Sequence, residues 1–234
     1  MLYKTPFLLL LLLLARLSVS GQASLYQVEL LFKMDSLSKK EAPSRHFASL
    51  YLETMQLSML HFAQSDSGHL DFIHRFEVAF AEHFFRATGS QGRDPEAAAW
   101  LTYFNDRSKN ALQYQLLGIN AHINADLSSA LIHTFSLTEL KANKKAFLRF
   151  QQGLKSQFFR FYELNKKAIW FTRFLDNIPF NLARGYGSSM MSRWRKRQYK
   201  IALLHFKNPE KSIRLRSKTQ AHKDWIDQQI LRLF

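Results

Sequence analysis

The sequence contains no cysteine among its 234 residues. Disulfide bonds, cysteine-ligated zinc and thiol catalysis are therefore excluded, and the fold must depend on its core alone. Glycine and proline are scarce, with 8 and 5 residues, whereas 21 Phe, 8 Tyr and 4 Trp supply ample apolar surface. Few turn-forming residues and no convincing period-two alternation argue against a β-sandwich. The nucleophile elbow, the P-loop and the dinucleotide fingerprint are also absent.

A long hydrophobic run is missing too, since a membrane span takes about 20 apolar residues. The unbroken run from Phe7 to Ala15 has nine. It follows the basic Lys4 and precedes the small residues of Ser18 to Gly21, which is the order of a secretory signal peptide. We predict that residues 1–20 are a signal peptide and that the protein is exported, to the periplasm or beyond, with no transmembrane span in the mature chain. The alternative is an uncleaved membrane anchor.

Residues 21–234 are expected to form a single all-α domain, a bundle of about seven helices with a buried central helix. Asp94-Pro95-Glu96 and Asn208-Pro209-Glu210 each place a capping side chain before a proline in the first helical position. Ser136 to Glu139 reads as a capping box, and Asn177 to Gly187 looks irregular. The predicted helices cover 22–34, 44–64, 69–88, 95–104, 110–134, 137–176 with a bend near Gly153, and 209–234.

Charge is distributed unevenly along the chain. Residues 141–234 carry 22 Lys and Arg against 5 Asp and Glu, a balance of +17, whereas residues 1–140 carry −2. Such a basic half indicates an anionic partner, and for an exported protein anionic lipid or envelope polysaccharide fits better than nucleic acid. The alternative is a solvated basic surface with its aromatic residues docked inward. The candidate residues for binding an anionic surface are Arg193, Trp194, Arg195, Lys196, Arg197 and Lys200.

The most informative stretch is a polar segment inside the apolar central helix. His122 and Asp126 are four residues apart and share a helix face, and Asn120 and Asn124 form a second such pair. Polar groups inside a buried helix cost free energy unless partners satisfy them. The stretch is therefore a structural hydrogen-bond hub or the wall of a ligand pocket. The residues concerned are Gln115, Asn120, His122, Asn124 and Asp126.

The same helix also admits a metal or catalytic interpretation. Two His and a carboxylate suit a divalent metal such as zinc, and a His oriented by a carboxylate can act as a general base. Further His residues fall on the predicted core-facing stripes of other helices, whereas His74 and Glu77 fall on the predicted solvent side. The candidate metal ligands are His61, His83, His122, Asp126 and His133.

The segment from Leu117 to Leu127 resembles the hallmark of a bacterial family, the domain of unknown function 5995. The likeness is good over residues 45–135 and poor in the basic remainder, and Ser128-Ser129 departs from the small aliphatic or proline-containing sequence that follows the hallmark in relatives. The resemblance implies a helical fold and no established activity. Further similar segments are Phe47 to Thr54, Phe76 to Ala87, and Ala99-Trp100.

A more distant likeness is to the zinc-dependent phospholipase C and single-strand nuclease group. These are exported all-α enzymes with a metal-binding His-x-x-x-Asp on a helix, which His122 and Asp126 match. Their next ligand lies six residues after the Asp, where this sequence has Ile132, with His133 one residue late. Their N-terminal Trp ligand is missing as well, so the likeness serves as analogy alone.

Two functional hypotheses follow from these patterns. In the first, the protein is an exported helical protein that binds a ligand or an anionic envelope component in a pocket lined by the His122/Asp126 helix. In the second, it is a metal-dependent hydrolase of phosphoester or lipid substrates that uses His122 and Asp126.

Overall fold

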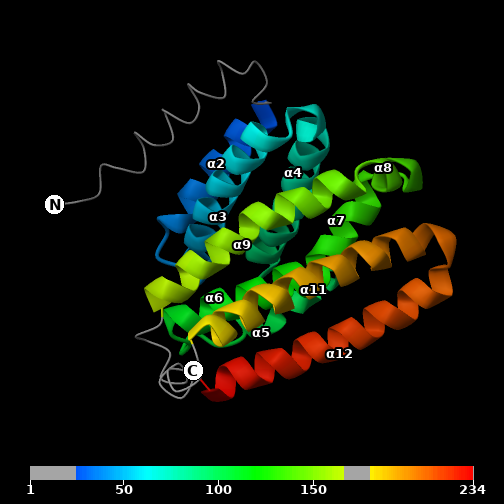
Figure 1. The fold of residues 1–234 in the computed structure, drawn as a ribbon. Helices are drawn as coiled ribbons and strands as arrows, with labels where there is room; N and C mark the ends of the chain where they lie inside the picture. Colours follow the sequence, from blue (N-terminus) through cyan, green and yellow to red (C-terminus); the bar gives the residue numbers. More distant parts are fainter. Residues whose placement is uncertain (1–24, 166–179, 234) are drawn as a thin grey trace.

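In the computed structural model, residues 25–165 and 180–233 are described, and all regular structure within these ranges is helical (Figure 1). The predicted all-α class is confirmed, while the predicted signal peptide lies outside the described residues. Among the described helices, none combines the length and the apolar character needed to cross a membrane. The elements are α2 (Leu25–Ser38), α3 (Ser44–Ser65), η1 (Ser67–His69), α4 (Leu70–Ser90), η2 (Pro95–Trp100), α5 (Leu101–Phe104), α6 (Ala111–Ala121), η3 (His122–Asp126), α7 (Leu127–Thr134), α8 (Leu137–Ala142), α9 (Lys144–Asn165), α11 (Phe180–Lys207) and α12 (Pro209–Leu233).

Capping side chains set several of the predicted helix starts. The Asp94 carboxylate accepts the backbone N–H of Glu96, and the Asn208 side chain accepts that of Lys211. The capping box at the start of α8 forms as predicted. Ser44 does not cap α3, because Pro43 occupies the cap position and Ser44 is buried within the first turn.

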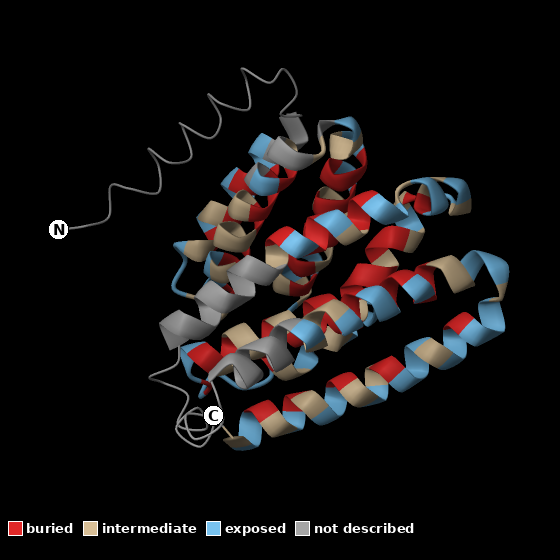
Figure 2. Ribbon diagram, viewed as in Figure 1, coloured by how far each residue is buried: buried red, intermediate tan, exposed pale blue. Residues whose placement is uncertain are grey.

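The segment α6–η3–α7 is the buried centre of the structure. It packs against α3 and α4 on one side and against α11 and α12 on the other, and its side chains are mostly buried (Figure 2). Leu117, Leu127 and Leu131 are almost fully buried in the main hydrophobic core. The prediction of a buried central helix is therefore confirmed, and α3, α4, α11 and α12 all pack against it.

Two predicted irregularities are placed differently in the structure. Helix α11 begins at Phe180 and continues through Gly185 and Gly187, a stretch predicted to be irregular. Each helical glycine costs about 1 kcal/mol, and tertiary packing overrides a cost of that size. The break predicted near Gly153 lies instead at Asn143, between α8 and α9. Gly153 is helical and lies against the ring of His61, where a Cβ would come within 3.0 Å.

Two helices are rotated about their axes relative to the prediction. On α3 the three- and four-residue spacing of Phe47, Leu50, Thr54, Leu57 and His61 predicts an inward stripe, but His61 is exposed. The observed stripe also starts at Phe47 and buries larger side chains: Tyr51, Met55, Met59 and Phe62. On α12 the sequence predicts apolar contacts at Ile213, Trp225, Ile226, Ile230 and Leu233, but Ile213 and Trp225 are exposed, at 66% and 55%. The face that α12 buries is largely polar and consists of Ser212, Thr219, Lys223, Asp227 and Ile230.

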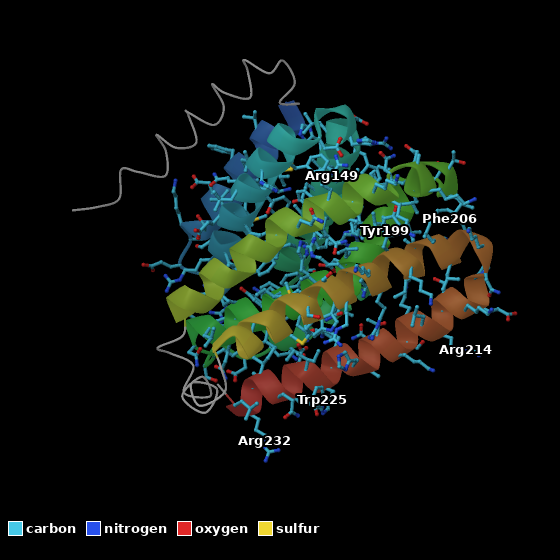
Figure 3. All side chains as sticks on the ribbon, viewed as in Figure 1. Arg149, Tyr199, Phe206, Arg214, Trp225 and Arg232 are labelled. Carbon is cyan, nitrogen blue, oxygen red and sulfur yellow. The ribbon has the colours of Figure 1, made fainter. Side chains whose placement is uncertain are left out.

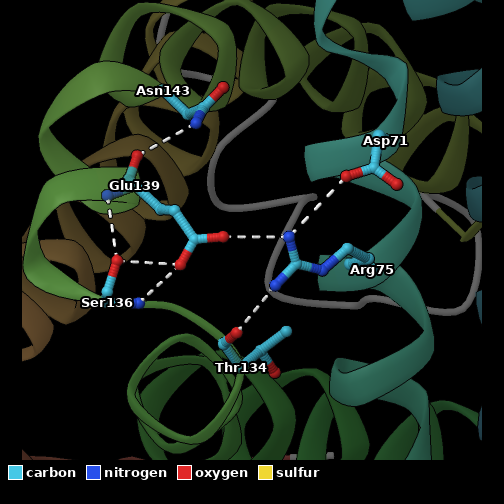
Figure 4. Close-up of polar contacts among 6 residues, drawn as sticks. All are labelled: Asp71, Arg75, Thr134, Ser136, Glu139 and Asn143. Carbon is cyan, nitrogen blue, oxygen red and sulfur yellow. Dashed lines mark hydrogen bonds and ion pairs between the residues drawn. The ribbon is translucent and has the colours of Figure 1, made fainter.

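An arginine ties the end of α7 and the start of α8 to α4 (Figure 4). The Arg75 guanidinium donates to the Glu139 carboxylate at 2.9 Å and to the backbone carbonyl of Thr134 at 3.1 Å. It also lies 3.6 Å from the Asp71 carboxylate. Because these groups are partly exposed, the ion pairs contribute on the order of 1 kcal/mol, and their main effect is to fix the direction of the turn between α7 and α8.

Gly118 provides a direct test of how closely α3 approaches the central helix. A Cβ at Gly118 would lie 2.9 Å from the Cβ of Phe47 and even closer to its ring. We expect Gly118→Ala to lower the free energy of unfolding by about 1–3 kcal/mol, because the core must shift to relieve the overlap. Gly89→Ala is the control, since no atom lies within 4 Å of that position. Urea unfolding that ranks Gly118→Ala as neutral would contradict this packing.

Candidate functional site

The polar segment of the central helix forms a π-helical turn, His122–Asp126, between α6 and α7. Sequence reasoning predicted an uninterrupted α-helix here. The Leu127 N–H bonds to the carbonyl of His122, five residues back, so the turn holds one residue more than an α-turn. Such π-turns occur frequently at functional sites. The two polar pairs are offset by two residues, so they lie on different sides of the segment and contact different groups of helices.

The first pair, His122 and Asp126, contacts the side of η2, α3 and α4. The Nδ1 atom of His122 lies 3.0 Å from Oδ2 of Asp126, and the indole N–H of Trp100 donates to the same oxygen at 2.9 Å. An oxygen that accepts the indole proton also accepts one from the imidazole, so we assign the ring proton to Nδ1. The lone pair of His122 is then on Nε2, which is buried and has no hydrogen-bond partner among the described residues.

Aromatic rings enclose His122. Its ring stacks on Phe80 with centroids 3.4 Å apart and meets Tyr51 edge-on at 4.7 Å. Burial lowers the pKa of His122 well below its usual range, and the nearby side chains of His83 and Arg195 lower the pKa further. Burial also raises the pKa of Asp126, against the opposing effects of the Trp100 bond and the Lys223 charge. The imidazole is therefore neutral at neutral pH.

The second pair, Asn120 and Asn124, contacts α11 and α12. The Asn120 amide donates to the Lys223 carbonyl at 2.8 Å and to the Asp227 carboxylate at 2.7 Å. Asn124 donates to the Asn120 side-chain oxygen at 2.8 Å. Lys223 and Asp227 are themselves joined at 2.7 Å. These bonds explain the polar buried face of α12 and make this pair a structural hub, which is one of the two alternatives left open by the sequence.

A pocket of about 350 Å³ lies beside His122. Five helices and the π-turn contribute to its wall, and its buried polar residues from outside the central helix include Glu77, Gln151 and Arg195. Gln115, which the sequence placed on the same stripe as His122, does not line it. The complete lining comprises Phe47, Leu50, Tyr51, Thr54, Met55, Glu77, Ile119, His122, Ile123, Leu148, Gln151, Gln152, Leu154, Met191, Ser192, Arg195 and Lys196.

Unpartnered polar atoms concentrate at this pocket. Ten buried side-chain nitrogen or oxygen atoms lack a hydrogen-bond partner among the described residues, and six of the ten belong to four pocket residues. Buried polar groups in proteins are almost always hydrogen-bonded, so such a cluster indicates missing partners. The six atoms are the Tyr51 hydroxyl, His122 Nε2, both amide atoms of Gln151, and Nε and Nη1 of Arg195.

Glu77 is the acid of the pocket and is only 3% exposed. Burial raises its pKa to about 7, although the Arg195 charge and the adjacent Tyr51 hydroxyl lower it. The Tyr51 hydroxyl is close to Glu77 without making a hydrogen bond of ordinary geometry. The prediction that His74 and Glu77 face solvent is wrong, since both are buried. Glu77 thus changes its charge near neutral pH inside the pocket.

The five candidate metal ligands do not converge. His61 is exposed on α3 and lies against Gly153. His83 and His133 stack on each other with centroids 6.4 Å apart, while His122 and Asp126 form their own pair. Among the described residues, no group of three or more His, Asp or Glu side chains is placed to hold a metal ion. The structure therefore brings four of the five together as two pairs, His122 with Asp126 and His83 with His133, and leaves His61 apart.

The basic run of α11 is divided between the interior and the surface. Trp194 and Arg195 are buried, and the buried Tyr199 donates its hydroxyl proton to the Leu140 carbonyl. On the outside, α12 exposes Arg214 and Arg232 together with Trp225 (Figure 3), and α11 exposes further cations. Binding to an anionic surface stays a prediction. Of the candidate cations, only the exposed ones could make that contact: Arg193, Lys196, Arg197 and Lys200.

Sequence reasoning missed Tyr51, Glu77 and Gln151 as pocket residues, and it assigned Arg195 to an anionic surface and not to a pocket. A signal existed for Glu77, because it lies four residues after Ile73 and three before Phe80, on a stripe of buried residues. A charged residue on such a stripe indicates a buried acid with a specific role. Gln151 and Arg195 lie in helices with many other polar residues, so neither stands out in the sequence as a polar residue on an apolar stripe.

Asp126→Ala tests the buried pair. It leaves the N–H groups of Trp100 and His122 without an acceptor, at about 1–3 kcal/mol each, so we expect a loss of about 2–5 kcal/mol in the free energy of unfolding. Asp126→Asn keeps an acceptor oxygen and is expected to lose clearly less. Ser129→Ala, on the next helical turn, controls for a change in this helix. Equal stability of the alanine and asparagine variants in urea titrations is the result that this geometry forbids.

Glu77→Gln tests the buried acid through pH. In the folded protein the pKa of Glu77 is raised from 4.5 to about 7. The stabilisation that comes from the protonated carboxyl is therefore fully present below about pH 4.5 and is lost as the pH rises to about 7. The difference corresponds to about 3 kcal/mol. The stability of wild type relative to Glu77→Gln should fall by about that amount over this interval, measured by urea unfolding. A difference that stays constant with pH means that Glu77 is solvated.

The comparison with known proteins supports the resemblance found in the sequence. The model of the Family of unknown function (DUF5995) matches residues 28–232, so the match includes the basic half, where the likeness looked poor. No curated protein and no solved structure matches the chain. Since the match covers most of the sequence, the chain belongs to the family of unknown function DUF5995.

Proposed function

We propose that this protein binds a small molecule with an apolar body and a polar end in the pocket beside His122. One observation carries the proposal: six buried polar atoms without partners gather on the wall of a single 350 Å³ pocket. Leaving such groups unpaired costs about 1–3 kcal/mol each, and a ligand that pairs with them recovers that cost as affinity. The rest of the wall is mainly apolar, as in most small-molecule sites.

The alternative, a metal-dependent hydrolase, has less support from the geometry. The Oδ2 atom of Asp126 already accepts two hydrogen bonds, and Nδ1 of His122 is engaged with it. A zinc site needs further ligands, and the described residues offer no third one nearby. The free Nε2 of a carboxylate-oriented imidazole is suited to accept a proton from a bound ligand, so the proposal assigns His122 a hydrogen-bonding role.

A pair of variants on one helix tests occupancy of the pocket. Ser192 lines the pocket, whereas Ser189 is exposed about one turn earlier on α11. The uncharged fluorophore phenylnaphthylamine is expected to brighten on binding wild type. Ser192→Trp fills the pocket and should weaken this binding by about tenfold or more, and Ser189→Trp should leave it unchanged. Equal binding by both variants and wild type contradicts the proposal.

A further inference from the structure

Arg195 is a buried cation whose side chain opens onto the pocket. It is 8% exposed, and its Nε and Nη1 atoms have no hydrogen-bond partner among the described residues. A guanidinium keeps its charge in any protein environment, so it cannot escape this cost by losing a proton. A buried cation is costly unless an anion and hydrogen bonds compensate it. Glu77, the one acid among the described pocket residues, bonds to neither of these nitrogens.

The charges around the pocket favour an anion. Helix α11 contributes two cations to the lining, the buried Arg195 and the exposed Lys196. The groups facing Glu77 from the other elements are Tyr51 of α3 and the neutral His122 of the π-turn, and α9 supplies only uncharged side chains to the wall. With Glu77 protonated, the pocket carries positive charge alone.

The size and the wall of the pocket limit the shape of the ligand. A volume of 350 Å³ is at the small end of ligand sites, which span about 300–1,000 Å³, so it suits one chain and not a two-chain lipid. Of the two lining cations only Arg195 is buried, and one buried guanidinium balances one negative charge, so a phosphate monoester could pair its second charge only with the exposed Lys196. The apolar part of the wall includes Leu50, Met55, Ile119, Leu148, Leu154 and Met191.

We infer that the pocket selects a single-chain aliphatic monocarboxylate, with the carboxylate on Arg195 and the chain along the apolar wall. This inference rests on the proposed function and adds the chemical class of the ligand. The Gln151 amide and the Tyr51 hydroxyl lie on the same wall and supply further donors for the carboxylate oxygens.

Binding of a carboxylate is coupled to protonation of Glu77. A second negative charge beside Arg195 disfavours ionised Glu77, so the ligand binds best to the form in which Glu77 holds its proton. That form predominates below about pH 7. Affinity should therefore be constant between about pH 6, where the free carboxylate is ionised, and about pH 7, and fall by up to about tenfold for each pH unit above this interval. Arg195 stays charged throughout this interval.

Calorimetric titrations with octanoate, octanol and octyl phosphate test the inference. Octanoate should bind wild type more tightly than either analogue. Arg195→Gln should weaken octanoate binding by about tenfold to hundredfold and leave octanol binding intact, which also shows that the variant is folded. Arg197→Gln, exposed on the same helix, is the control. Glu77→Gln should bind octanoate with no pH dependence between about pH 6 and pH 9, and it carries the test alone if Arg195→Gln fails to fold.

Three results would overturn the inference. If octanol binds as tightly as octanoate, the pocket binds an aliphatic chain but does not select an anionic head group. If octyl phosphate binds more tightly than octanoate, the pocket does not select a monocarboxylate. If octanoate and octanol both fail to bind, and phenylnaphthylamine fluorescence is the same with Ser192→Trp as with wild type, then the proposed function fails together with this inference.

Discussion

The structure depends on how the buried polar residues of the central helix are satisfied. In an α-helix, residues two apart do not share a face, so the two pairs point to different groups of helices. The π-turn at His122–Asp126 adds one residue to the segment that carries them. Asn120 and Asn124 bind the polar face of α12, and Asp126 accepts hydrogen bonds from Trp100 and His122. The two pairs thus join the basic C-terminal helices to the aromatic core.

The π-turn pairs the Asp126 carboxylate and the Asn124 amide N–H but leaves the neighbouring pocket incomplete. Asp126 fixes the imidazole and leaves the Nε2 lone pair of His122 without a partner. Gln151 and Arg195 bring further unpartnered groups from α9 and α11. Six of the ten unpartnered buried polar atoms among the described residues belong to pocket residues, which indicates that the pocket is completed by something it binds. The strongly raised pKa of Glu77 in the same pocket agrees with that view.

Much of the fold could be predicted from sequence, because helix starts carry local signals. Asp94, Ser136 and Asn208 cap the helices that they were expected to cap. The family resemblance found the polar centre but not its winding, since a π-turn has no distinct periodicity over five residues. The pocket was out of reach for a different reason. Its wall joins residues 47–55, 77, 119–123, 148–154 and 191–196, and only tertiary packing brings these together.

The most direct test is a crystal structure of the protein soaked in octanoate, because it shows which atoms complete the pocket. The account predicts a carboxylate in contact with the Arg195 guanidinium, an alkyl chain along Leu50 and Ile119, and the Gln151 amide hydrogen-bonded to the ligand or to ordered water. A structure in which Arg195 pairs directly with Glu77, and the pocket is closed and empty under the same conditions, would contradict it.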